Sequence, residues 1–287
     1  MALEARTLES WGFEVRHTQS ASPDLDGVRL LVVNSGVAVD AALLTGADEL
    51  GLVITTTSGF DHIDTQAARE QGIAVARCPV SRRDAVVDTT LGMGLSLLRD
   101  LPGMQRAARR GQWVRSELPK RGARRIRDCR VGIVGLGVIG QRAAERWSAL
   151  GAEVLYTDPR HADSASLEVV LGCDIVSLHC SAEPAGEPVL GPAELAQLSR
   201  GTILLNTARG SCVDLPALLE IKGLGGLGLD VFPSEPYPSL EALAARPDVL
   251  LTPHAAGYFP GLGEALAQEV SACAGAWVQE QPLPHRV

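Results

Sequence analysis

The sequence predicts an α/β protein that is built from two domains, each with a parallel sheet. Short runs rich in β-branched residues alternate with helical stretches along the chain, and this alternation is typical of strand-helix-strand units. The chain has 287 residues, whereas domains cluster near about 100 to 150 residues. We therefore expect two domains rather than one.

The candidate strands are short apolar runs that are bounded by polar or turn residues. In chain order they cover residues 29–33, 52–56, 73–77, 130–135, 153–157, 174–179, 202–207, 226–232 and 248–253. Between the third and the fourth run, residues 85–110 have the apolar spacing of a helix, and we expect Pro102 and Gly103 to bend or break it. This helix is either a long core helix or the connection between two domains.

The composition argues against several classes of protein. Hydrophobic residues make up 46% of the chain, which predicts a packed core and not disorder. The net charge is −8 and the arginines form no single basic tract with interleaved aromatic residues, so we expect no nucleic-acid partner. Glu4, Arg6 and Glu9 stand where a signal peptide would be apolar, and no apolar run reaches membrane length. We expect a cytoplasmic protein that has no membrane partner.

The cysteines predict neither a zinc site nor a disulfide framework, because they form no Cys-x-x-Cys pair and no paired-histidine spacing accompanies them. We expect small buried side chains in a reducing compartment. The six positions are Cys78, Cys129, Cys173, Cys180, Cys212 and Cys273.

A glycine motif gives the first chemical indication. The strand at 130–135 runs directly into Gly135, Gly137 and Gly140, and a helix follows at once. The first glycine permits a tight turn, the second lets a pyrophosphate approach the backbone, and the third allows the helix to pack closely on the strand. The helix N-terminus then faces the phosphates. The spacing predicts a dinucleotide-binding domain.

The end of the next strand favours NAD as the cofactor. Asp158 lies 21 residues after Gly137, where its carboxylate can accept from both ribose hydroxyls of NAD and repel the extra phosphate of NADP. NADP stays open as an alternative, because Arg160 would offset part of this repulsion.

Four motifs in a fixed order extend this interpretation to a family. GLGVIG with Asp158 is followed by LLNTARG at 204–210, GLDVFPSEP at 228–236 and LTPHAAG at 251–257. Together they resemble the signature of the NAD-dependent D-2-hydroxyacid dehydrogenases. The resemblance implies two Rossmann-like domains, a flavodoxin-like substrate domain and an NAD-binding domain, with an intervening cleft. The bounds that we predict are 1–84 plus 262–287 for the substrate domain and 85–261 for the NAD-binding domain.

Three residues are the candidates for catalysis. Arg209 ends a strand of a parallel sheet, ligands bind beyond such strand ends, and a planar guanidinium suits a carboxylate. By resemblance, Arg209 holds the 2-oxo acid. Ketone reduction also needs a proton donor that titrates near neutrality, and His254 is the candidate. By resemblance, Glu235 stabilises the imidazolium and fixes its tautomer. The alternatives are a surface arginine that caps a strand and a structural histidine.

The resemblance also implies binding residues. Asp230 would orient the nicotinamide carboxamide, and Thr207 and Ala208 would line the ring. The expected cofactor contacts are Gly135, Gly137, Val138, Ile139, Asp158, His179, Thr207, Ala208, Asp230, His254 and Gly257. The substrate contacts are expected at Ser58, Gly59, Arg82 and Arg209, with the backbone of the turn at Ser58 and Gly59 receiving the substrate carboxylate. Near that turn, Asp61 and Asp64 are interpreted as local caps, and with His62 they suggest no metal site.

The chain departs from the family pattern before the connecting helix. Arg82 stands about where the family has Asn, and Asp88 replaces the Glu that the family has in the first turn of the helix. Our hypothesis is that Arg82, alone or with Arg83, binds a second anionic group of the substrate, such as a carboxylate or a phosphate. The alternative is a pair of loop arginines that point into water.

Two other functions stay open. The stretch PHAAGY at 253–258 resembles the erythronate-4-phosphate dehydrogenase branch. NAD-sensing transcriptional corepressors share the fold and the Arg, Glu and His, and in them the dinucleotide controls partner binding and not turnover. For an enzyme, the expected partners are a small 2-oxo or 2-hydroxy acid and, by resemblance, a second copy of the chain in a homodimer.

Overall fold

The computed structural model describes residues 2–117, 121–181 and 186–287, and the chain divides into two compact units. Unit 1 comprises Met1–Arg82 with Tyr258–Val287, and unit 2 comprises Arg83–Gly257. Each unit has a parallel sheet with helices, so the predicted fold class is confirmed. The domain bounds given above stay a prediction, because a compact unit is not thereby shown to fold independently.

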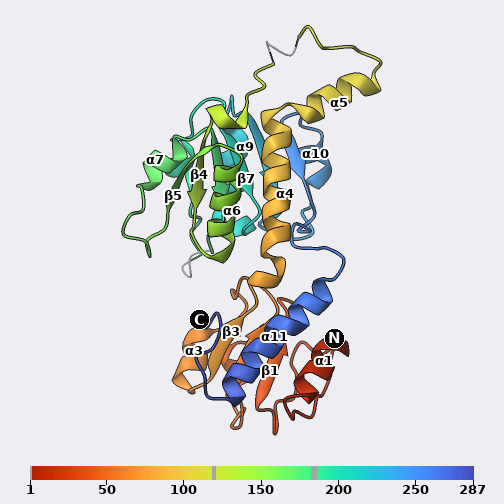
Figure 1. Ribbon diagram of the computed structural model, residues 1–287, viewed down its shortest axis with the longest axis vertical. Helices are drawn as coiled ribbons and strands as arrows, with labels where there is room; N and C mark the ends of the chain where they lie inside the picture. Colours follow the sequence, from red (N-terminus) through yellow and green to blue (C-terminus); the bar gives the residue numbers. More distant parts are fainter. Residues whose placement is uncertain (1, 118–120, 182–185) are drawn as a thin grey trace. The chain divides into compact units, whose positions relative to one another are not determined.

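Unit 1 contains a parallel sheet in the order β1-β2-β3. The residues of α2 and α3 pack on one face, and α1 and α11 lie side by side on the other (Figure 1). Since both faces are covered, the strands are apolar on both. The elements are α1 (Ala2–Glu9), β1 (Leu30–Val33), α2 (Ala41–Leu44), β2 (Leu52–Thr55), α3 (Thr65–Glu70), β3 (Ala74–Arg77), the first turn of α4 (Val80–Leu98) and α11 (Leu262–Val278).

Unit 2 contains a parallel sheet in the order β5-β4-β6-β7-β8-β9. The strands are β4 (Arg130–Val134), β5 (Glu153–Thr157), β6 (Ile175–Leu178), β7 (Ile203–Asn206), β8 (Gly226–Leu229) and β9 (Val249–Leu251). The chain passes from β4 to β5 on one side and then to β6 on the other side of β4. In open α/β sheets, ligands bind at such a switch point, outside the carboxyl ends of the strands.

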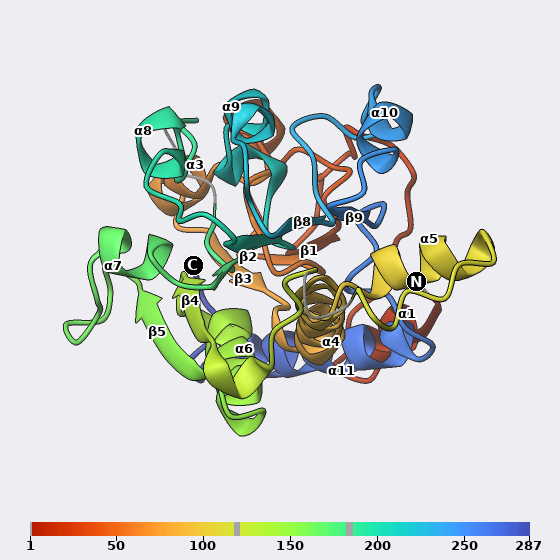
Figure 2. The ribbon, with the colours of Figure 1, turned by 90° about the horizontal axis from the view of Figure 1, so that it is seen from above.

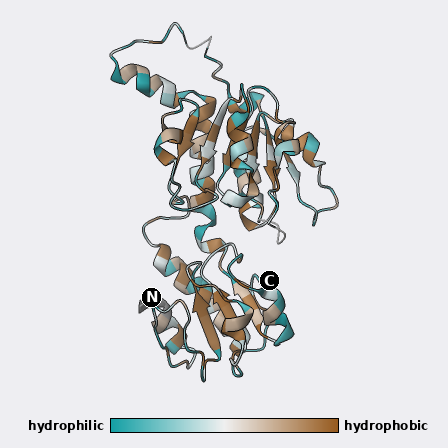
Figure 3. Cartoon of the chain, turned by 180° about the vertical axis from the view of Figure 1, so that it is seen from behind, coloured by the Kyte–Doolittle hydropathy of each residue, from teal (hydrophilic) through white to brown (hydrophobic). Residues whose placement is uncertain are grey.

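Helices cover both faces of the sheet in unit 2. In Figure 2, α4 and α6 lie on one side and α8, α9 and α10 on the other, which agrees with the two clusters of buried side chains. Figure 3 shows brown, hydrophobic stretches in the strands of both units, together with paler strands in unit 2. The helices of unit 2, besides α4, are α5 (Leu101–Arg109), η2 (Ile126–Asp128), α6 (Val138–Ala149), α7 (Leu167–Leu171), α8 (Pro192–Leu195), η3 (Gly210–Cys212), α9 (Leu215–Glu220) and α10 (Leu240–Ala244).

The helix that we predicted over residues 85–110 is divided differently from the expectation. It begins earlier, at Val80, and ends at Leu98, and a second helix follows after Asp100, whose φ is 51°. Pro102 lies in the first turn of α5, where a missing N–H is tolerated. Asp88 was expected in the first helical turn, and this was wrong, because the earlier start places it well inside α4.

Two further expectations concern the burial of the cysteines and membrane-spanning helices. Five of the six cysteines are buried, as predicted, and Cys180 is partly exposed. Among the residues that the structure describes, no helix is both long and apolar enough to cross a membrane.

Candidate active site

The turn between β4 and α6 needs glycine at two of its positions. Gly135 has a φ of +92°, which favours glycine, and its N–H donates to Thr157 O at 2.8 Å. A Cβ on Gly140 would lie 2.0 Å from Gly135 O, so α6 approaches the turn too closely for any other residue. Gly137 is the N-cap residue of α6 and gives no side-chain cap, and Val138 and Ile139 begin the helix. Their backbone N–H groups suit an anion.

Asp158 links the end of β5 to this turn. Its Oδ2 accepts from Leu136 N at 2.7 Å, and Arg160 contacts both carboxylate oxygens, at 3.0 Å through Nε and at 2.8 Å through Nη2. The hydrogen bonds from the Arg160 side chain hold the pKa of Asp158 well below its usual range, so the carboxylate is ionised. Asp158 therefore lies where a ribose-binding carboxylate is expected, and Arg160 shares it.

His179 follows β6 and packs against the glycine turn. Its Cβ would lie 3.3 Å from a Cβ on Gly140, and its Nε2 is 2.9 Å from Ser177 Oγ. Burial lowers the pKa of His179 to about 4, so the ring is neutral at pH 7. Its Nδ1 is buried and has no hydrogen-bond partner in the described part of the chain. A buried polar atom without a partner is costly, and a bound ligand would satisfy it.

The side chain of Asn206 folds the turn that carries Arg209. Asn206 ends β7, its Nδ2 donates to Arg209 O at 2.9 Å, and its Oδ1 accepts from Ala208 N at 3.1 Å. Thr207 is buried and its hydroxyl lies 2.7 Å from that of Thr90 in α4. These contacts place Arg209 just beyond the carboxyl end of β7, as the sequence predicts.

Asp230 holds the loop of His254. It follows β8 and is 1% exposed. Its Oδ1 accepts from Thr252 Oγ1 at 2.5 Å and from Ala255 N at 2.8 Å, and its Oδ2 accepts from Ala256 N at 3.1 Å. The carboxylate thus accepts its hydrogen bonds from the protein itself. Contact of Asp230 with a nicotinamide carboxamide stays a prediction. Its hydrogen bonds fix the loop that ends at Gly257.

His254 and Glu235 are brought together within unit 2. His254 Nδ1 lies 2.6 Å from Glu235 Oε2, and Glu235 Oε1 accepts from Phe232 N at 3.0 Å. His254 has a φ of 52°, which is uncommon for a residue with a side chain and is held here by the contacts of Asp230. Its side chain is 51% exposed. Since Nδ1 is bonded to the carboxylate, Nε2 is the ring nitrogen that can exchange a proton with a ligand.

In unit 1, the predicted turn contains a hydroxyl that lacks a partner. Ser58 Oγ is buried and has no hydrogen-bond partner among the described residues, while Ser58 O accepts from Arg77 at 2.9 Å. Gly59 O accepts from Thr57 Oγ1 at 2.7 Å. His62 Nε2 lies 3.1 Å from Thr55 Oγ1. In the described residues, no three metal-ligating side chains gather.

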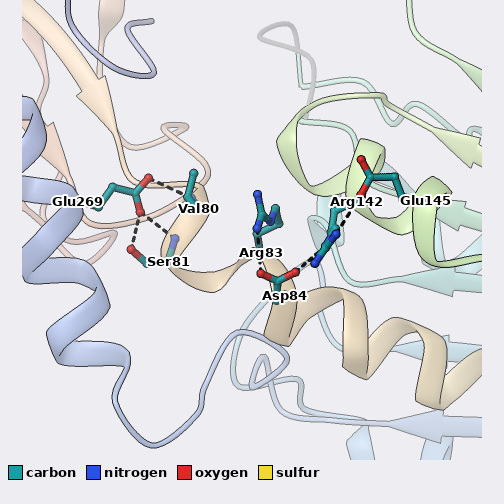
Figure 4. Close-up of polar contacts among 7 residues, drawn as sticks. All are labelled: Val80, Ser81, Arg83, Asp84, Arg142, Glu145 and Glu269. Atoms are coloured by element: carbon teal, nitrogen blue, oxygen red, sulfur yellow. Dashed lines mark hydrogen bonds and ion pairs between the residues drawn. The ribbon is translucent and has the colours of Figure 1, made fainter.

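Arg82 and Arg83 have different surroundings. The guanidinium carbon of Arg82 lies 5.2 Å from the ring centroid of Tyr258, within unit 1, and Arg82 has no carboxylate partner among the described residues. Its Nε is buried without a hydrogen bond. Arg83, within unit 2, donates to Asp84 at 2.9 Å (Figure 4). Arg83 is therefore neutralised locally, and Arg82 is the cation that an anion could reach.

The first two turns of α4 take part in two contacts of carboxylates (Figure 4). In unit 1, Glu269 of α11 accepts from Val80 N at 3.0 Å and from Ser81 N at 2.8 Å. In unit 2, Asp84 accepts from Arg142 of α6 at 2.7 Å. The sequence motifs did not indicate the roles of Glu269, Asn206 and Thr90. Of these three, only Asn206 could be recognised from its neighbours in the sequence. It stands between a strand and a turn, and an asparagine side chain can form such a turn.

The middle of the chain matches a known protein family. Residues 91–256 match the model of the D-isomer specific 2-hydroxyacid dehydrogenase, NAD binding domain. The chain is similar to an erythronate-4-phosphate dehydrogenase of Salinibacter ruber, with 38% identity over 84% of this chain and 60% of that protein. It is also similar to a glyoxylate/hydroxypyruvate reductase of Arabidopsis thaliana, with 30% identity over 94% of this chain and 84% of that protein.

Solved structures agree with this comparison. A D-lactate dehydrogenase of Aquifex aeolicus, crystallised with NAD and lactic acid, matches with a TM-score of 0.83 and 25% identity over 98% of this chain and 92% of that chain. The chain spans less than two thirds of the length of several curated relatives that it matches, 62% for the phosphoglycerate dehydrogenase of Haemophilus influenzae.

Proposed function

This chain belongs to the family of D-isomer specific 2-hydroxyacid dehydrogenases, and from this premise we propose that it interconverts a 2-oxo acid and the matching D-2-hydroxy acid with NAD(H). The observation that carries the proposal is the 2.6 Å contact between His254 Nδ1 and Glu235 Oε2. It leaves Nε2 for proton exchange with a substrate oxygen, which is what the reduction of a ketone needs besides a hydride.

The groups of unit 2 have distinct roles in this reaction. NADH, when bound, supplies the hydride that the carbonyl carbon receives. The imidazolium of His254 donates its Nε2 proton to the carbonyl oxygen, and Glu235 stabilises the charged ring before the transfer. Arg209 is the candidate for holding the substrate carboxylate, because a guanidinium can donate two parallel hydrogen bonds to it. In the oxidative direction, the neutral ring of His254 accepts the proton.

The residues of unit 2 fit NAD. The glycine turn and the N-terminus of α6 would receive the pyrophosphate, and Asp158 would accept from the ribose hydroxyls. His179 Nδ1, which is buried and without a partner in the described residues, is available to a donor or acceptor of the cofactor. Thr207, Ala208, Asp230 and Gly257 remain candidates for the nicotinamide side.

We further propose that the substrate has a second anionic group, which Arg82 binds. Arg82 has no carboxylate partner among the described residues, and its guanidinium lies over the 69% exposed ring of Tyr258. The names of two relatives support an anionic substrate, since one acts on erythronate 4-phosphate and another on 3-phosphoglycerate. Ser58 and Gly59 are the candidates for the substrate carboxylate in unit 1.

One set of rate measurements tests both proposals. Initial rates of NADH oxidation are measured with singly anionic acids (glyoxylate, pyruvate, hydroxypyruvate) and doubly anionic acids (oxaloacetate, 2-oxoglutarate, phosphonopyruvate). We expect turnover that His254→Ala abolishes. Arg82→Ala should raise the KM for the doubly anionic acids roughly tenfold to a hundredfold, the effect of one lost charge-assisted contact. It should leave the KM of the singly anionic acids nearly unchanged.

Arg83→Ala is the matched control, because it removes the same charge from a side chain that is paired with Asp84. If Arg82→Ala raises KM equally for both groups of acids, Arg82 does not bind a second anion. If no acid is reduced although NADH binds, the dehydrogenase proposal fails and the corepressor-like alternative gains weight.

The second candidate is oxidation of erythronate 4-phosphate. It is favoured by the 38% identity to the Salinibacter ruber protein. NADH formation from 4-phosphoerythronate, compared with 3-phosphoglycerate, would decide between sugar-acid phosphates of different length.

We also propose that the chain works as a cytoplasmic homodimer. The exposed Leu101 (48%) and Trp113 (87%) in and after α5 support the dimer, since large apolar side chains at the surface often lie in interfaces. Sedimentation equilibrium of the purified chain and of Trp113→Ser would test it.

A further inference from the structure

Two cysteines of unit 2 lie with their sulfur atoms in contact. Cys180 follows β6 and Cys212 ends η3, and their Sγ atoms are 3.7 Å apart. Cys212 Sγ also lies 3.8 Å from Cys180 O. A disulfide needs about 2.0 Å between the sulfurs. The two thiols therefore have to approach by less than the width of one atom, which side-chain rotation and a small backbone shift can provide.

The remaining cysteines lack this combination of contact and access. Cys129 and Cys173 are buried, their thiols lie against backbone carbonyls of their own neighbourhood, and burial raises the pKa of both. Burial also raises the pKa of Cys78, and that of Cys273 to about 11. A thiol with a raised pKa forms little thiolate, the reactive species. Cys180 alone among the six is partly exposed, and Cys212 is its fully buried neighbour.

The pair joins two segments that the proposed site uses. A Cβ on Gly135 would lie 2.7 Å from the Cα of Cys180, so the backbone of Cys180 packs directly on the first glycine of the dinucleotide turn. Cys212 N donates to Arg209 O at 3.1 Å, in the turn that carries the catalytic arginine. A covalent bond between the sulfurs would pull these two segments together.

We propose that Cys180 and Cys212 form a reversible disulfide that weakens binding of the dinucleotide. The oxidant is a peroxide. The thiolate of Cys180 attacks one oxygen of hydrogen peroxide, the O–O bond breaks, and water leaves a sulfenic acid on Cys180. The Cys212 sulfur then attacks the sulfenic sulfur and a second water leaves. Two thiols and one peroxide give one disulfide and two waters, and a dithiol reductant reverses the step.

This chemistry suits a reducing compartment, where disulfides are usually transient and serve in redox sensing. The disulfide itself does not depend on the proposed function, whereas its effect on NADH binding rests on the cofactor site proposed for unit 2.

The test treats the full chain with hydrogen peroxide and then blocks the remaining thiols. Mass spectrometry of the digested protein should find one peptide pair that joins Cys180 to Cys212 and is lost after dithiothreitol. NADH binding, followed by fluorescence, should weaken roughly tenfold on oxidation, the size of a typical coupling between sites, and recover on reduction. Cys212→Ser should keep its NADH affinity under peroxide. Cys173→Ser, the matched control, should respond as the unaltered chain does.

Three results would overturn the proposal. One is oxidation of Cys180 to a sulfinic acid with no joined peptide. Another is a joined peptide with unchanged NADH affinity. The third is an equal loss of affinity in Cys212→Ser. Because peptide masses and NADH binding are measured without any oxo acid, failure of the proposed dehydrogenase reaction would not be mistaken for failure of the disulfide.

Discussion

At the scale of single residues, the contact of Glu235 with His254 determines the expected chemistry. Glu235→Gln keeps the size of the side chain and the bond from Phe232 N, but removes the charge that favours the imidazolium. We expect kcat for oxo-acid reduction to fall roughly tenfold to a hundredfold. Initial rates of NADH oxidation measure this loss.

Glu241→Gln is the control, because Glu241 is an exposed carboxylate of α10 in the same unit. Equal rates in Glu235→Gln and Glu241→Gln would contradict a role for Glu235 in stabilising the charge on His254. The identity of this pair could be predicted from the sequence, because each residue stands in its own motif. The hydrogen bonds of Asp230 to the loop of His254 could not, because strand-end loops meet only after the sheet has formed.

At the scale of secondary structure, the start of α4 depends on a residue far along the chain. Glu269 accepts from the N–H groups of Val80 and Ser81, 189 and 188 residues away in sequence. A carboxylate at a helix N-terminus usually contributes about 1 kcal/mol. Glu269→Ala should therefore lower the free energy of unfolding by about 1 to 2 kcal/mol and speed hydrogen exchange at the start of α4. Urea denaturation and exchange mass spectrometry measure these effects.

Gln268→Ala is the matched control, since Gln268 is the exposed neighbour on the same helix. Equal exchange rates near Val80 in both variants would show that Glu269 does not hold this turn. The distance in sequence also explains why the start of the helix was predicted five residues too late. Residues 80–84 have no apolar periodicity, and the group that caps them could not be recognised without the fold.

At the scale of the whole molecule, the parallel sheets and the order of helices and strands could be predicted because each strand is a short apolar run with a distinct boundary. The switch point at β4 in unit 2 is typical of a dinucleotide turn, which follows that strand. Burial of particular polar groups is a property of the complete fold. His179 is an example, because it packs against the glycine turn and its Nδ1 is buried.

The burial of His179 predicts how the stability of the fold depends on pH. In the unfolded chain a histidine binds a proton near pH 6.5, whereas in the folded chain burial lowers the pKa of His179 to about 4. Between these values the unfolded state binds more protons, so stability is lost as the pH falls from 6.5 towards 4. The loss from this one residue amounts to about 3 kcal/mol at most.

His179→Gln removes the titrating group and keeps a side chain that can bond to Ser177. We expect its free energy of unfolding, measured by urea denaturation, to be lower than that of the unaltered chain at pH 7, and the difference to shrink as the pH approaches 4.5. The control is His161→Gln. Its free energy of unfolding should change between pH 7 and pH 4.5 by the same amount as that of the unaltered chain. If His179→Gln and the unaltered chain lose stability in parallel over this range, His179 is protonated in the folded protein, and its Nδ1 is not the neutral, buried group that the proposed cofactor contact requires.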